Sequence, residues 1–176
     1  MSTTKWVIDP THSEIGFKVK HMMFTNVSGQ FTKFTAEAET EGDSFDNARF
    51  SFSGDIDSIS TGNADRDGHL LSADFFDAAQ HPKLSFESTA FTKKNEGEYA
   101  LTGNLTVRGV SKPVTLDVEF GGVAKDPWGN TKAGFSITGK LNRKDWGLTW
   151  NSALETGGVL VGEEVKLTIE LQFVKQ

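Results

Sequence analysis

Residues 48–57 read ARFSFSGDID, and in this stretch apolar and polar residues alternate with a period of two. Successive side chains of a β-strand point to opposite faces of its sheet, so the alternation gives this strand one apolar and one polar face. The apolar face carries Ala48, Phe50, Phe52, Gly54 and Ile56. Such a strand is typical of an antiparallel sheet that packs one face on a core and exposes the other to water.

The same alternation recurs on both sides of this stretch, in short segments joined mostly by hairpin-length links. These segments cover residues 6–8, 15–19, 29–38, 84–89, 99–107, 114–120, 135–141 and 165–173. No strand–helix–strand pattern is present, and a closed sheet is the simplest way for so many strands to avoid exposed edges. We therefore predict an all-β fold: a single antiparallel barrel of about eight strands, in one domain over residues 1–176. Such a barrel is either filled by side chains or holds one small ligand.

Three features interrupt the alternation and leave alternatives open. Phe31 and Phe34 stand three apart, which predicts a bulge or bend within one strand. The apolar cluster at residues 22–24, MMF, is interpreted first as core under a loop and second as a gate at the barrel mouth. Some glycines fall on apolar strand faces, where they either bend the wall or leave room inside the barrel: Gly54, Gly103 and Gly139.

Residues 63–82, NADRDGHLLSADFFDAAQHP, depart from the period of two. Leu71 and Phe75 stand four apart and would share one face of a helix. Asn63 suits an N-cap, and the acidic residues that follow it suit a first helical turn. Pro82 forces the residue before it towards an extended conformation. We predict a short helical segment at about residues 63–80, laid across the barrel as a lid or side wall.

Composition excludes several classes of function. A net charge of −6 and a pI near 5.2 argue against a nucleic-acid-binding protein, which needs a basic face. The absence of cysteine excludes disulfides, thiolate metal sites and a cysteine nucleophile. The N-terminus MSTTKWVIDP lacks the apolar core of a signal peptide, and no apolar run is long enough to span a membrane. We expect a cytoplasmic protein, although a chain trimmed of its signal, and therefore periplasmic, would look the same.

Residues with catalytic or metal-binding potential form no recognisable motif. The histidines show neither the HxH nor the i,i+4 spacing of a zinc site: His12, His21, His69 and His81. No G-x-S-x-G nucleophile motif occurs. Carboxylates are plentiful but spread over polar strand faces, so a glycosidase-type pair that meets in space stays open. The pattern favours a binding protein over an enzyme, with no metal site and no catalytic cofactor.

A series of motifs along the chain resembles the YceI-like family. The series contains W-x-x-D-x-x-H-S-x-x-x-F-x-x-K-H (residues 6–21), G-x-F (29–31), R-D-x-H-L-x-S-x-x-F-F-D with H-P-x-x-x-F (66–86), G-x-L-T-V-R-G-V-S-K-P-V (103–114), D-P-W-G-N-x-x-x-G-F (126–135), L-N-R-x-D-W-G (141–147) and V-G-E-E-V-K-L (161–167). The resemblance covers essentially the whole chain in order. It implies a lipocalin-like antiparallel barrel around a long apolar channel, which binds polyisoprenoids, isoprenoid quinones or fatty amides, often in a dimer. The family has no agreed catalytic residues, and many of its members are periplasmic.

The apolar strand faces become the predicted walls of that channel. An excess of Phe, fourteen against one Tyr, suits such walls because Phe brings apolar area without a polar group. The predicted lining residues are Phe17, Val19, Phe31, Phe50, Phe52, Ile56, Phe86, Leu101, Leu105, Leu116, Phe135 and Ile137, with Leu70, Leu71, Phe75 and Phe76 from the helical segment. His21, Arg66 and His69 are candidates to meet a ligand head group at the mouth. The alternative places Arg66, Asp67 and His69 on a solvated helix face.

The function expected from these observations is binding of a long-chain isoprenoid or related amphiphilic lipid, of the polyprenyl or quinone type. The purpose would be transport, storage or sensing, and the protein is expected to form a homodimer. Two alternatives remain open from the sequence. One is a stress-response interaction protein with a filled barrel, and the other is an enzyme that acts on an isoprenoid lipid.

Overall fold

The computed structural model of the protein describes residues 2–152, 154 and 160–176. Its strands are β1 (Thr3–Ile8), β2 (Glu14–His21), β3 (Thr25–Phe31), β4 (Phe34–Glu41), β5 (Ser44–Asp55), β6 (Ile59–Ser60), β7 (Lys83–Asn95), β8 (Glu98–Val107), β9 (Val110–Lys125), β10 (Thr131–Asn142) and β11 (Val161–Lys175). The helical elements are α1 (Ala64–Leu71) and the short 3₁₀ helices η1 (Pro10–His12), η2 (Ile56–Ser58) and η3 (Arg143–Trp146).

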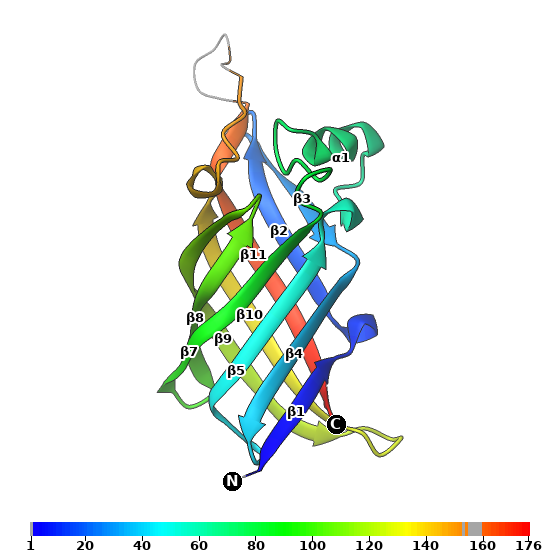
Figure 1. The fold of residues 1–176 in the computed structure, drawn as a ribbon, viewed down its shortest axis with the longest axis vertical. Coiled ribbons are helices and arrows are strands. Elements are labelled where there is room, and N and C mark those ends of the chain that lie inside the picture. The colour runs from blue at the N-terminus through cyan, green and yellow to red at the C-terminus, as the bar shows by residue number, and fades with distance from the viewer. Residues whose placement is uncertain (1, 153, 155–159) are drawn as a thin grey trace.

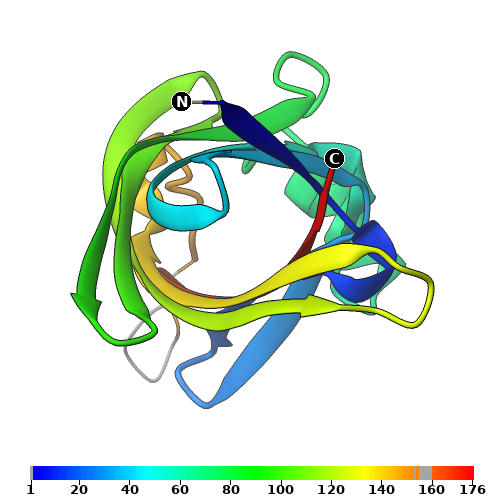
Figure 2. The ribbon, with the colours of Figure 1, turned by 90° about the horizontal axis from the view of Figure 1, so that it is seen from below.

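Most of the strands close into one antiparallel barrel. Its spatial order is β1, β4, β5, β7, β8, β9, β10 and β11, and β11 pairs back to β1. Figure 1 shows both chain termini at the lower end of this barrel, and Figure 2 shows the strands as a ring seen along the axis. The closed barrel of eight strands confirms the fold class predicted from the alternation.

The strands β2, β3 and β6 extend the barrel on one side at its upper end (Figure 1). β11 pairs with β1 near its C-terminus, where Phe173 lies opposite Ile8. Earlier along the strand it pairs with β2, where Leu167 lies opposite Phe17. β3 pairs with β2, and the two-residue β6 pairs with β3. One long strand, β11, therefore belongs to both the barrel and its extension.

Of the bulge or bend predicted between Phe31 and Phe34, the structure shows a bend, at Lys33. The strand predicted to run through both residues divides there into β3 and β4. The N–H of Thr32 donates to the carbonyl oxygen of Ser58, 3.2 Å away, instead of joining a strand ladder. β4 continues beside β5, whereas β3 turns to β6. The chain between β5 and β7, which includes α1, therefore runs beside β3 at the upper end.

The helix α1 is shorter than predicted, since it ends at Leu71 rather than near residue 80. Its start is confirmed: the side-chain oxygen of Asn63 accepts a hydrogen bond from the N–H of Arg66 at 3.0 Å. Ser72 ends the helix in an extended conformation, and successive turns lead from there to β7. Within the part of the chain that the structure describes, no helix is long and apolar enough to cross a membrane.

Asp9 connects η1 to the barrel through a set of polar contacts. Its carboxylate accepts hydrogen bonds from Nζ of Lys132 on β10 at 2.9 Å and from Oγ1 of Thr11 at 2.7 Å. Nδ1 of His12 lies 2.8 Å from Oδ2, the carboxylate oxygen that also accepts from Lys132. These partners, Lys132 first, hold the pKa of Asp9 well below its ordinary value.

Replacing Asp9 by Asn is therefore expected to lower the free energy of unfolding at neutral pH by about 1–2 kcal/mol. A carboxylate whose pKa is depressed by folding contributes stability above its unfolded pKa of about 3.9, and this contribution is lost as the pH falls through the folded pKa. Urea unfolding at a series of pH values should show the wild-type advantage at pH 7 shrinking steadily below about pH 4. A constant difference down to the acid limit would contradict this role for Asp9.

The tip of the β2–β3 hairpin has unusual turn residues. Met22 and Met23 have φ angles of 53° and 66°, and the N–H of Phe24 donates to the carbonyl oxygen of His21 at 3.2 Å. Positive φ at both central positions makes a type I′ turn, which favours Asn-Gly. The three apolar side chains are 40%, 57% and 77% exposed, in chain order, so the first interpretation of this cluster as core is wrong.

The double variant Met22→Asn, Met23→Gly is expected to stabilise the protein by about 1 kcal/mol, because both new residues adopt positive φ with less backbone strain. Urea unfolding followed by circular dichroism measures the change. The variant Met23→Ala is the control, since it truncates the side chain but keeps the strained φ, and it should give no gain. A double variant less stable than the wild type would contradict the turn assignment.

Candidate functional site

The upper part of the barrel encloses a cavity of about 570 Å³. The wall follows the alternation of the strands, and β11 shows this most clearly: every second residue from Val165 to Phe173 lines the cavity. At a rise of about 3.4 Å per residue and a strand tilt of about 40°, this wall extends about 20 Å along the barrel axis. The cavity is therefore long and narrow, a shape that suits an extended chain.

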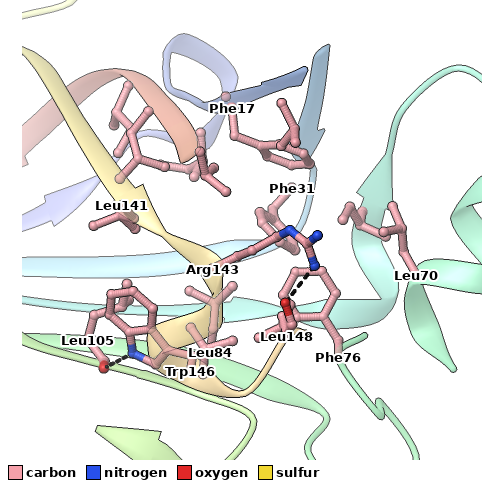
Figure 3. A pocket seen from close by; sticks show the side chains of 18 of the residues that line it. Phe17, Phe31, Leu70, Phe76, Leu84, Leu105, Leu141, Arg143, Trp146 and Leu148 are labelled. Carbon is pink, nitrogen blue, oxygen red and sulfur yellow. Dashed lines mark hydrogen bonds between the residues drawn. The ribbon is translucent and has the colours of Figure 1, made fainter. Parts of the chain in front are cut away.

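Most of the residues predicted to line a channel do line this cavity. They are Phe17, Val19, Phe31, Phe50, Phe52, Leu70, Phe75, Phe76, Phe86, Leu101, Leu105, Leu116 and Ile137. Figure 3 shows Phe17, Phe31, Leu70 and Phe76 gathered around one part of it. That these side chains contact a lipid stays a prediction.

The structure places Ile56, Leu71 and Phe135 away from the cavity wall. Ile56 is buried in η2, where the strand alternation has already ended. Leu71 is half-buried at the end of α1, about 100° around the helix from the lining residue Leu70. Phe135 is buried within a cluster of aromatic rings at the lower end of the barrel. The helix period therefore gave the wrong face at Leu71 alone. At Ile56 the strand has already ended, and Phe135 lies on the inner face but below the cavity.

The aromatic cluster closes the lower end of the cavity. The ring of Phe45 lies 4.8 Å from Trp6, 5.2 Å from Phe120 and 5.2 Å from Phe135, measured between ring centres. Phe50 and Phe173 belong both to this cluster and to the cavity lining, with their ring centres 5.9 Å apart. We call Phe50 and Phe173 the floor, because a molecule in the cavity would end there.

Two of the three glycines on apolar faces accommodate neighbouring lining side chains. The phenyl ring of Phe86 occupies the space that a Cβ at Gly103 would need, and Leu116 occupies that space at Gly139. The ring of Phe17 lies over Gly29 in the same way. A large side chain that lies against glycine backbone on a neighbouring strand is a known way to fill the gap that glycine leaves. These glycines thus let Phe86, Leu116 and Phe17 lie close to the wall.

The three head-group candidates all line the cavity. Arg66 donates from Nε to Oγ1 of Thr61 at 2.8 Å and from Nη2 to the Thr61 carbonyl at 2.7 Å. Nε2 of His69 lies 2.9 Å from a carboxylate oxygen of Asp74. His21 ends β2. The helix therefore turns Arg66 and His69 inward, whereas Asp67, on the same turn, accepts a hydrogen bond from the N–H of Thr61.

Sequence reasoning missed a second wall, which is formed by η3 and the chain that follows it. It contributes Arg143, Trp146, Leu148 and Trp150 to the cavity. Nε1 of Trp146 donates to the Leu105 carbonyl at 2.9 Å, which fixes this wall to β8 (Figure 3). The run from Asn142 to Gly147 could have predicted η3, because Asn suits the N-cap and Gly the C-cap of a short helical turn. In the structure Asn142 caps η3, and Gly147 ends it in the left-handed conformation.

Arg143 is the unusual member of this wall, since its side chain is buried in an otherwise apolar setting, at 6% exposure. It donates from Nε to the Gly162 carbonyl at 2.8 Å, from Nη1 to the Leu148 carbonyl at 2.6 Å and from Nη2 to the Val161 carbonyl at 3.3 Å. Burial lowers the pKa of Arg143 from its ordinary value. Figure 3 shows its guanidinium group reaching between Phe31, Phe76 and Leu148.

The polar groups around the cavity are few and do not form a metal centre. Among the residues that the structure describes, no three His, Asp or Glu side chains converge in a way that could hold a metal ion. The acidic group Asp65 lines the cavity near Arg66, but the wall is otherwise dominated by apolar side chains. The arrangement is therefore suited to sequestering an apolar molecule with a small polar end.

Comparison with protein families identifies the lineage of this barrel. The model of the YceI-like domain matches residues 6–173. The chain belongs to the YceI-like family. Among curated relatives, the UPF0312 protein SERP2314 of Staphylococcus epidermidis is 39% identical over 173 residues, which cover 97% of each chain. The resemblance predicted from the sequence motifs is thereby confirmed.

Solved structures of YceI-like proteins have the same fold. The Campylobacter jejuni YceI protein is 34% identical, with a TM-score of 0.77 over 89% of this chain and 90% of that chain. A polyisoprenoid-binding domain from Saccharophagus degradans, implicated in plant cell wall breakdown, aligns with a TM-score of 0.71 over 97% of this chain and 98% of that chain. The second structure is only 13% identical, so its likeness shows a shared barrel fold alone.

Proposed function

We propose that this protein binds one long-chain isoprenoid or similarly long amphiphilic lipid, such as an isoprenoid quinone, with its tail in the barrel cavity. The observation that carries the proposal is the long apolar cavity with a closed lower end. Membership of the YceI-like family supports it, and so does the likeness to a domain described as polyisoprenoid-binding. A stress-response protein with a filled barrel is disfavoured, since such a barrel would leave no cavity.

The energetics of this proposal follow from burial. Each CH₂ group moved from water into the cavity contributes about 0.8 kcal/mol, less the cost of ordering a flexible tail. The floor at Phe50 and Phe173 limits how much of a tail can be buried. Binding of this kind selects a ligand by the length and width of its tail. The protein would then act as a carrier, store or sensor of the lipid rather than as an enzyme.

A series of isoprenoid alcohols with increasing numbers of isoprene units tests the proposal. The affinity, measured by titration calorimetry, is expected to rise by about tenfold or more for each added unit and to level off once the tail reaches the floor. The stoichiometry should be one lipid per chain. Affinities that do not change with tail length, or no binding of any member of the series, would reject the proposal.

A further inference from the structure

The buried guanidinium group of Arg143 has no acidic partner among the residues that the structure describes. Among the residues that the structure describes, no carboxylate oxygen lies within the 4.0 Å of a salt bridge to this group. The negative charge of Glu163 acts to raise the pKa of Arg143, but Glu163 is exposed and pairs with another residue. Its Oε1 lies 2.7 Å from Nζ of Lys144. A buried charge without a partner is unfavourable, so this arrangement requires an explanation.

The three hydrogen bonds to carbonyl oxygens explain why Arg143 is held in place, but they do not explain why a charged group is buried there. They connect η3 to the start of β11 through Val161 and Gly162, and to the chain after η3 through Leu148. Neutral amide donors could make such contacts without a charge. A guanidinium group has five N–H donors, and the contacts with residues in the described part of the chain use three of them. These contacts leave one N–H on each terminal nitrogen. Two neighbouring donors with a positive charge match the two oxygens of a carboxylate.

The position of Arg143 also suits a ligand end group. The side chain lines the same cavity as the floor, and its guanidinium carbon lies 6.0 Å from the ring centre of Phe75. Its carbonyl partners at Val161 and Gly162 lie at the beginning of β11, whereas the floor residue Phe173 lies near the end of that strand. A lipid with its polar end at Arg143 would therefore extend its tail along β11 to the floor.

We infer that Arg143 binds the carboxylate of a long-chain acid, so that the preferred ligands of the cavity are amphiphiles with an anionic rather than a neutral head group. This inference rests on the proposed function and adds the chemical class of the head group. Arg66 and His69 line the same cavity but are only half-buried, and His69 contacts the carboxylate of Asp74. Arg143 differs from both because it is buried, and its contacts with described residues are all to neutral carbonyls.

The test compares two probes with the same tail, hexadecanoate and hexadecanol, on the full chain at about pH 8, where the acid is ionised. The wild type is expected to bind hexadecanoate about tenfold to a hundredfold more tightly, the factor that a charged hydrogen-bonded pair provides. Arg143→Gln should lose this preference and bind hexadecanol as the wild type does. Lys144→Gln, which removes an exposed charge from the same turn, should keep the preference.

The outcomes separate the inference from the proposed function. Equal affinity of the wild type for acid and alcohol would overturn the inference and leave the proposed function standing. This comparison uses the wild type alone, so it does not depend on whether a variant folds. Retention of the preference in Arg143→Gln would overturn the role of this residue. Failure of both probes to bind, together with failure of the isoprenoid series, would reject the proposed function itself. If Arg143→Gln does not fold, Arg143→Lys should fold with the charge retained and keep part of the preference, and loss of the whole preference would count against the inference.

Discussion

Replacing Ile137 by Trp is expected to lower the affinity for a long-tailed lipid about a hundredfold while the protein stays folded. Ile137 is a buried lining residue on β10, opposite Ile169 of β11, about midway along the wall. A larger side chain there would obstruct the passage to the floor and exclude about four CH₂ groups of the tail, at about 0.8 kcal/mol each. Titration with a long and a short isoprenoid measures the effect, and the short one should bind almost normally.

Thr138 provides the matched control, because it follows Ile137 on the same strand and is exposed on the outer face. Thr138→Trp adds the same side chain outside the barrel and should leave both affinities unchanged. An Ile137→Trp variant that still binds the long isoprenoid as tightly as the wild type would show that the tail does not pass this point. Circular dichroism of both variants establishes that the barrel is intact.

Trp6→Ala is expected to reduce the free energy of unfolding by about 3–5 kcal/mol, the largest loss of stability expected here for a single substitution. Trp6 is completely buried beneath the floor, and its ring lies 4.8 Å from that of Phe45. Its Nε1 donates to Oγ1 of Thr40, itself buried, at 3.0 Å. The substitution removes this hydrogen bond and leaves a cavity in the aromatic cluster. Urea unfolding followed by circular dichroism gives the change.

The control for this variant is Trp128→Ala, since Trp128 is 83% exposed in the β9–β10 turn. Its expected effect lies within about 0.5 kcal/mol of zero, as for most surface substitutions. A loss of less than about 1 kcal/mol in Trp6→Ala would contradict the view that the cluster is tightly packed and closes the lower end of the cavity.

The sequence was sufficient to predict the barrel and most of its inner face. Alternation fixes which residues share a face, so the amino-acid order alone assigns Phe50, Phe52 and Ile137 to the interior. It does not say at what height along the barrel a residue lies. Phe135 shares the inner face of β10 with Ile137 but belongs to the aromatic cluster below the cavity. Depth depends on strand register and stagger, which pairing of distant segments determines.

The helix and the η3 wall were harder to predict for different reasons. The spacing of Leu71 and Phe75 indicated a helix, but only the packing of α1 decides that Leu70, Arg66 and His69 face the cavity. Arg143 lies in an irregular segment without periodicity, and a charged residue in a loop is normally solvated. Its burial results from backbone carbonyls that β11 brings together, a consequence of tertiary structure alone.

Native mass spectrometry of the protein purified from cells without added lipid tests most directly whether the barrel holds a lipid. The account predicts a mass excess of one long-chain lipid per polypeptide, which solvent extraction releases and tandem mass spectrometry identifies. Thr138→Trp should retain this species, and Ile137→Trp should lose it. Polypeptide without bound lipid in every preparation, or the same lipid bound in equal amount to both variants, would contradict the claim that the barrel cavity binds a lipid tail.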